Sequence, residues 1–181
     1  MTQRSPYDAL STARQRLLCV VFIALTLVYG QLLKRQGEPL MAALPHGIVS
    51  LELPGTPAVA QQMITSLGAL APVARRQVQL DFGYLLLYPV AFSLVCALLA
   101  ERNGPGLARF GRLMSWAVLL AAPLDAIENV ALLQMLDGQT QAPWPQLSTV
   151  CATLKFSLLI AAAGQTVLGL LGMVLARRRR G

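Results

Sequence analysis

Four long apolar stretches, separated by polar and turn-forming segments, dominate the chain. They cover residues 17–33, 80–100, 113–136 and 147–176. The last three exceed the roughly 20 residues that a helix needs to cross the hydrocarbon core of a bilayer, and the first is near the lower limit. Only helices and closed barrels satisfy their backbone groups in lipid, and these stretches lack the alternation of barrel strands. The pattern therefore predicts four membrane-spanning helices, at about residues 10–34, 78–101, 107–137 and 146–177.

The long connection between the first two helices, residues 35–77, contains predicted structure of its own. "VSLELPG" is typical of a short extended piece that ends in a turn. In "TPAVAQQMITSLG", Thr56 is a predicted N-cap, Pro57 is the first helical residue and Gly68 is the stop signal. The apolar residues of this segment share one helix face: Val59, Met63, Ile64 and Leu67. We expect a short amphipathic helix that lies on the membrane surface or covers the mouth of the bundle.

Composition supports a membrane protein. Residues of the AVILMFWYC set make up 55% of the chain and charged residues only 13%, about half the usual soluble share. The predicted fold class is all-α: one integral membrane domain, residues 1–181, built as a four-transmembrane-helix bundle with the short amphipathic helix in its first extracytoplasmic loop. The net charge of +7 does not indicate nucleic-acid binding, because the basic residues flank the apolar stretches.

The distribution of lysine and arginine predicts the orientation. With the N-terminus inside, ten of them lie in cytoplasmic segments, including Arg177–Arg180, and four lie outside. Positive charge favours the cytoplasmic side. We therefore expect a multi-pass protein of a bacterial inner membrane, with both termini in the cytoplasm. The alternative for the first stretch is a cleaved signal peptide, with "VYG" before the cleavage site.

Ionisable side chains inside the apolar stretches are the candidate functional residues. Each costs about 2.5–3.5 kcal/mol on insertion scales, so we expect them to face the bundle interior and to find partners. Asp125, Glu128 and Asn129 are spaced i, i+3 and i+4 and share a helix face. Counting residues from the helix ends puts Glu128 and Lys155 at a similar depth. The predicted buried polar cluster comprises Asp81, Tyr84, Tyr88, Asp125, Glu128, Asn129 and Lys155.

The charges of this predicted cluster do not balance, because three carboxylates accompany one ammonium group. One or two carboxylates should be protonated, or a bound cation should compensate. Pro123 and Pro89 remove backbone hydrogen bonds within two of the helices and are predicted to kink them.

Other chemistry has little support in the sequence. Cys19, Cys96 and Cys151 lie in apolar runs without CxxC spacing, so we interpret them as small buried hydrophobic residues. His46 is the single histidine, and we predict neither a metal site nor a cofactor. No GxSxG, Walker A or GxGxxG motif occurs, and no catalytic residue can be named.

The pieces "SLELPGT", "LDFGYLLLY", "DAIENVALL" and "TLKF" together resemble an uncharacterised family of small four-helix bacterial integral membrane proteins. The family pattern of LD, DxxEN and a lysine in the fourth span corresponds to Asp81, Asp125, Glu128, Asn129 and Lys155 here. The resemblance covers about residues 17–163 and carries no activity. It implies that these five polar positions belong together.

Three classes of function remain open. The first is binding of a lipid or small amphiphile, with Lys155 meeting an anionic head group or Glu128 a cationic one. The second is a membrane enzyme that uses a carboxylate of raised pKa beside Lys155 for acid–base chemistry on a lipid-soluble substrate. The third is a structural or interaction subunit with architectural ion pairs. The lipid bilayer is the expected partner, and the oligomeric state is not predicted.

Overall fold

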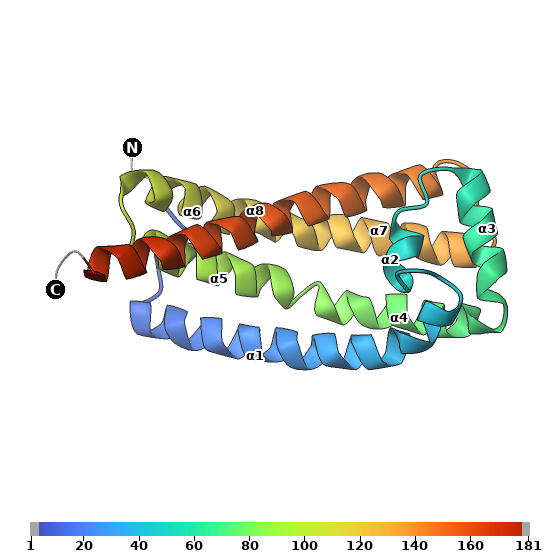
Figure 1. Ribbon diagram of the computed structural model, residues 1–181, viewed down its shortest axis with the longest axis horizontal. Helices are drawn as coiled ribbons and strands as arrows, with labels where there is room; N and C mark the ends of the chain where they lie inside the picture. The colour runs from blue at the N-terminus through green and yellow to red at the C-terminus, as the bar shows by residue number, and fades with distance from the viewer. Residues whose placement is uncertain (1–3, 179–181) are drawn as a thin grey trace. The chain divides into compact units, whose positions relative to one another are not determined.

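The computed structural model of the chain describes residues 4–178, and their secondary structure is helical without a strand (Figure 1). Four helical runs are long and apolar enough to cross a membrane: Thr12–Ala42, Pro57–Ala100, Pro105–Leu136 and Trp144–Leu175. This confirms the predicted all-α bundle of four membrane-spanning helices and is what a multi-pass membrane protein requires. Arg179 and Arg180, the end of the predicted basic tail, lie outside the described residues.

Eight α-helices and three short 3-10 helices (η) make up the described chain. In order they are α1 (Thr12–Gly37), η1 (Glu38–Ala42), α2 (Ile48–Glu52), α3 (Pro57–Leu67), η2 (Gly68–Leu70), α4 (Ala71–Tyr84), α5 (Tyr88–Ala100), α6 (Pro105–Ala117), η3 (Val118–Leu120), α7 (Ala121–Leu136) and α8 (Trp144–Arg178). The second helix was predicted to begin near residue 78, but α4 already begins at Ala71. Much of the predicted loop is therefore helical.

Prolines interrupt the second and third of the four runs. Pro89 is the second residue of α5, and the three residues before α5 form a turn that separates it from α4. Pro123 follows the 3-10 turn η3 and lies in the first turn of α7. Proline has no N–H to donate to the preceding turn, and its ring crowds the carbonyl four residues earlier. The predicted interruptions of helix geometry are present at both prolines.

The chain divides into two compact units. Unit 1 comprises Met1–Thr26, Leu87–Ala121 and Phe156–Gly181, and unit 2 comprises Leu27–Leu86 and Ala122–Lys155. In unit 1, Gly111 of α6 permits a close approach to α5, because a Cβ there would lie 3.0 Å from the Cβ of Ala100 and 3.1 Å from the backbone oxygen of Cys96. A small residue at such a crossing is typical of helices that pack in membranes.

Unit 1 has two small apolar cores. Cys96, Met114, Val118 and Ala162 form one, and Cys19, Leu94 and Leu98 form the other. In the N-terminal segment, the Tyr7 hydroxyl donates to Ser93 Oγ at 2.9 Å, and the indole N–H of Trp116 donates to the carbonyl of Arg4 at 2.9 Å. All three cysteines of the chain are free and buried, as predicted.

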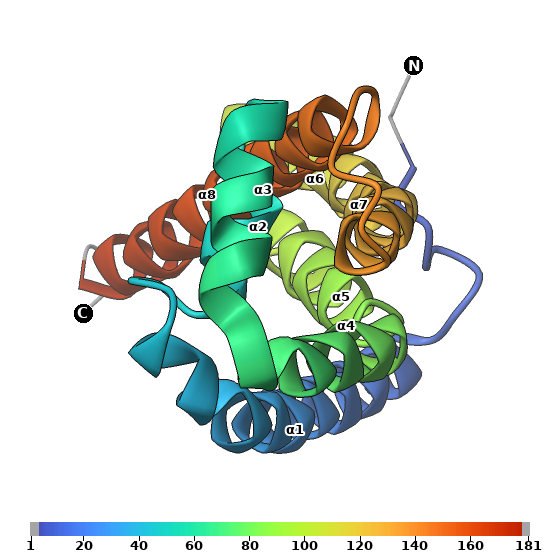
Figure 2. The same ribbon diagram turned by 90° about the vertical axis from the view of Figure 1, so that its right-hand side faces the viewer.

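Unit 2 is built around one apolar core. Nine buried side chains form it, contributed by the segment after α1 and by α2, α3, α4 and α7: Leu40, Leu44, Leu51, Ala60, Leu67, Ala74, Val78, Leu132 and Met135. Within this unit, α3 runs transverse to α4 and α7 at one end: its last residues lead to the start of α4, and α7 ends beside it (Figures 1 and 2). The predicted amphipathic helix is thus a cap on the apolar core of unit 2.

The ends of α3 match their predicted signals. The Thr56 side chain accepts from the N–H of Val59 at 3.4 Å, Pro57 opens the helix, and Gly68 ends it with a φ of +47°. Its buried face differs in one residue from the prediction. Ala60 is fully buried, whereas Val59 keeps 37% of its surface exposed. The packed stripe therefore runs through Ala60 and Leu67, with Met63 and Ile64 half-buried beside it.

The prediction of an extended piece at "VSLELPG" was wrong, because residues 48–52 form the helix α2. Gly47 precedes α2 with a φ of +57°, a conformation that suits glycine. The backbone N–H of His46 donates to Ser50 Oγ at 3.1 Å, which stabilises this turn. Leu51 is buried in the core, while Leu53 is 43% exposed. Tertiary packing of Leu51 and the turn at Gly47 outweigh the alternating pattern.

Candidate functional site

Lys155 of α8 lies at the centre of a buried cluster of acidic side chains in unit 2. Its Nζ is 2.7 Å from Asp125 Oδ1, 2.9 Å from Glu128 Oε1 and 3.4 Å from Glu52 Oε2. Asp125 and Glu128 are 2% and 0% exposed, and Lys155 is 5% exposed. The lysine and the DxxE pair, distant in sequence, therefore meet inside the protein. We call Glu52, Asp81, Asp125, Glu128, Asn129 and Lys155 the acidic cluster.

The lysine ammonium group is saturated by these contacts. It carries three N–H donors and no acceptor, and three carboxylates lie within ion-pair distance. An anionic ligand at Lys155 would have to displace one of them and bring another negative charge beside the rest. The geometry therefore argues against an anionic head group at Lys155, which was one of the two binding modes expected from the sequence.

The polar cluster continues on α4. Asn129 follows Glu128 on α7, and its Nδ2 donates to Asp81 Oδ2 at 2.8 Å. Tyr84, one turn after Asp81, stacks on Tyr29 of α1 with ring centroids 6.0 Å apart, and the Tyr29 hydroxyl donates to the Leu80 carbonyl at 2.8 Å. Asn129 is thus the residue that joins Asp81 to the same helix as the two carboxylates at Lys155.

Helix geometry on α7 explains why three of these side chains point the same way. Glu128 and Asn129 each follow Asp125 by about one helical turn, so the three lie on one side of the helix, and all three are buried. Exposed apolar residues occupy other positions of the helix, with Ile127 at 45% and Val130 at 44% exposure. The polar face of α7 therefore turns inward, and its apolar face is available to lipid.

Tyr88, which the sequence grouped with these residues, belongs to unit 1, where it is 5% exposed at the start of α5. The other six residues of the predicted cluster belong to unit 2. A role for Tyr88 in lining the cluster stays a prediction.

Glu52 is the member of the cluster that the sequence did not indicate. It is the last residue of α2, and three contacts tie this end of α2 to α8. Glu52 contacts Lys155, the Glu52 carbonyl accepts from Ser148 Oγ at 3.0 Å, and the N–H of Gly55 donates to Thr149 Oγ1 at 2.8 Å. Ser148 and Lys155 are two turns apart on α8, so they face the same side. That spacing was the available signal, but nothing local marked Glu52 as their partner.

The acidic cluster has more acceptors than donors. The cluster contains four carboxylates and one ammonium group: three carboxylates contact Lys155, and the fourth, Asp81, is bound by Asn129. The buried Glu128 Oε2 has no hydrogen-bond partner within residues 4–178. Full ionisation of all four in an apolar environment would be costly. In the same part of the chain, no group of three or more His, Cys, Asp and Glu side chains is arranged to hold a metal ion.

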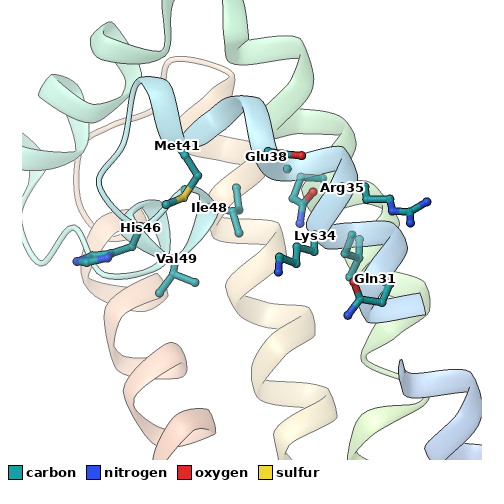
Figure 3. A pocket seen from close by; sticks show the side chains of 12 residues that line it. Gln31, Lys34, Arg35, Glu38, Met41, His46, Ile48 and Val49 are labelled. Carbon is teal, nitrogen blue, oxygen red and sulfur yellow. The ribbon is translucent and has the colours of Figure 1, made fainter. Parts of the chain in front are cut away.

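A second feature of unit 2 is an open groove with a volume of about 650 Å³, which the sequence did not predict. It is lined by the end of α1, by η1, by the turn before α2 and the first two residues of α2, and by Gln77 of α4 (Figure 3). Its apolar side chains include Leu33, Met41, Ile48 and Val49, and its polar ones include Gln31, Lys34, Arg35, Glu38, His46 and Gln77. We call this feature the amphipathic groove.

Comparisons with protein-family models, with curated proteins and with solved structures found no match for this sequence.

Proposed function

We propose that this protein is an integral membrane protein that binds a lipid or a small amphiphile in the amphipathic groove. The observation that carries the proposal is the groove lining, in which apolar and charged side chains face one space at the end of a membrane-spanning helix. Its volume of about 650 Å³ falls within the range of small-molecule sites.

The surface of α1 supports an amphiphile rather than a water-soluble ligand. Leu27, Val28 and Leu32 are 64%, 70% and 51% exposed on the turns that precede the groove. In a membrane such residues face acyl chains, so a hydrocarbon tail along α1 would meet an apolar surface and the head would reach the groove. The ligand then needs no aqueous route to its site.

The proposed function is consistent with the orientation in the membrane that the sequence predicts. The lysine and arginine distribution supports a multi-pass membrane protein with both termini in the cytoplasm, and a bacterial inner membrane stays part of the proposal. In that orientation the end of α1 that lines the groove lies on the outer side of the membrane.

An architectural role is the second candidate for the acidic cluster, and a specific observation favours it. Lys155 is saturated by carboxylates from α2 and α7, and the participating groups on α7 and α8 are at most 5% exposed. Such a cluster fixes the register of α7 and α8 and the position of α2 against α8. No comparable observation favours the remaining candidate, an enzyme with acid–base chemistry at Lys155.

A tryptophan substitution in the groove, with a matched substitution outside it, tests the proposed function. Val49 lines the groove and is 38% exposed, while Val59 of α3 is 37% exposed and is not among the groove residues. We expect native mass spectrometry in mild detergent to show a bound amphiphile on the wild type and on Val59→Trp. Val49→Trp should lose it, because the indole fills the groove.

The proposed function is wrong if the wild type binds neither co-purified nor added amphiphile saturably, or if Val49→Trp and Val59→Trp retain it equally. Circular dichroism of all three proteins establishes that the helices are intact in each comparison.

A further inference from the structure

We propose that the ligand of the amphipathic groove is an anionic phospholipid, with its phosphate at Lys34. This inference rests on the proposed function, because it specifies the ligand of the same groove. Lys34 lies in the last turn of α1, and its side chain extends into the groove from the α1 side, opposite Ile48 and Val49 (Figure 3).

The charge in the groove is the first argument. Lys34 and Arg35 are both exposed, and within the described residues neither has a carboxylate at ion-pair distance. Glu38 is the one acidic residue of the lining, against Lys34, Arg35 and the histidine His46. The four carboxylates of the acidic cluster are not part of the lining. The groove lining therefore has an excess of basic side chains, in contrast to the acidic cluster. Charge complementarity favours a negatively charged head group in the groove.

A buried amide in the groove is the second, independent argument. Gln77 is 7% exposed, lines the groove, and its Oε1 has no hydrogen-bond partner within residues 4–178. A buried acceptor without a partner destabilises the fold, so a donor from a ligand would be favourable there. A hydroxyl of a head group such as glycerol can donate to it. Phosphate at Lys34 together with a hydroxyl at Gln77 describes a phosphatidylglycerol-type head group.

The position of the groove favours a lipid over free phosphate. Lys34 follows the exposed apolar residues of α1, so a phosphate held there has its acyl chains beside Val28 and Leu32. A soluble anion would gain nothing from that apolar surface. The competing explanation is that Lys34 interacts with any anionic membrane surface and has no specific site. The control is therefore a variant that removes another exposed basic residue outside the groove.

The experiment compares retention of phosphatidylglycerol and phosphatidylcholine with identical acyl chains, measured by native mass spectrometry from mixed micelles. We expect the wild type to retain more phosphatidylglycerol than phosphatidylcholine. In Lys34→Gln the ratio of the two retained lipids should fall about fivefold, which corresponds to the contribution of one cation near an anionic lipid. Arg76→Gln removes the same charge from an exposed position of α4 outside the groove and should keep the preference.

Equal losses in Lys34→Gln and Arg76→Gln would show a general electrostatic effect and overturn the inference, as would equal binding of both lipids by the wild type. Displacement of the lipid by inorganic phosphate at millimolar concentration would identify a site for the free anion instead. If Val49→Trp abolishes retention while Lys34→Gln keeps the head-group preference, the proposed function survives and the inference on the phosphate fails.

Discussion

The acidic cluster and the amphipathic groove lie in the same unit and both contain a lysine, but the two lysines differ in burial and in their partners. In the cluster, Lys155 is 5% exposed and its three donors face three carboxylates. In the groove, Lys34 is exposed and no described carboxylate lies within ion-pair distance. A saturated, buried charge stabilises an arrangement of helices, whereas an accessible, unpaired charge is available to a ligand.

The short helix α2 connects the two regions. Ile48 and Val49, its first residues, line the groove, while Glu52, its last residue, contacts Lys155. A change in the cluster that releases Glu52 therefore also releases one wall of the groove. Substitutions in the acidic cluster should therefore change stability, and a substitution of Glu52 should also change binding in the groove.

The largest effect is expected for Lys155→Met. It leaves Asp125 and Glu128 buried without their cation, and breaking a buried pair in this way costs about 3–5 kcal/mol. Denaturant titration in detergent micelles measures the free energy of unfolding. Lys34→Met is the matched control and should change it by less than about 0.5 kcal/mol, because Lys34 is exposed. Similar values for the two variants would contradict the assignment of saturated and free lysines.

Adding Asp125→Asn and Glu128→Gln to Lys155→Met should recover at least half of that loss, since the carboxylates that lost their cation are then neutral. If the combined variant is less stable than Lys155→Met alone, the carboxylates contribute through contacts other than the ion pairs.

An intermediate effect is expected for Asn129→Ala. The variant removes the donor to Asp81 Oδ2 and leaves the half-buried carboxyl group without that hydrogen bond, at a cost of about 1–3 kcal/mol. A double-mutant cycle with Asp81→Ala isolates the pair, and the two losses should not add. Strict additivity would mean that the 2.8 Å contact between Asn129 and Asp81 contributes nothing to stability.

The smallest effect on stability, about 0.2–1 kcal/mol, is expected for Glu52→Gln, because its contact with Lys155 is the longest of the three at 3.4 Å and its side chain is 12% exposed. The same variant should also lower lipid retention by up to about fivefold, because the Glu52–Lys155 contact holds α2 in place. A fivefold change corresponds to the upper limit of the stability loss expected for this contact.

Glu38→Gln is the control for this coupling. It removes a carboxylate from the groove lining without touching the cluster, so anionic lipid should be retained equally or better and the stability should not change. If Glu52→Gln also increases retention, Glu52 acts only as a charge and α2 does not couple the two regions.

The sequence by itself determined the four spans, because about 20 consecutive apolar residues have one stable arrangement in lipid, the hydrogen-bonded helix. It also determined the ends of α3, where Thr56, Pro57 and Gly68 act through their own backbone. The inward face of α7 followed from helical periodicity and from the cost of charge in hydrocarbon, which together pointed to Asp125, Glu128 and Asn129 and to a cationic partner.

Only the tertiary structure decided the rest. The alternation in "VSLELPG" favoured an extended segment, yet the packing of Leu51 and the turn at Gly47 made it a helix. That helix brought Glu52 to Lys155, 103 positions along the chain, a partner that no local pattern marks. The groove likewise combines residues 31–49 with Gln77. Local propensity and hydropathy act over a few turns of chain, whereas partners and cavities depend on which distant surfaces fill the same space.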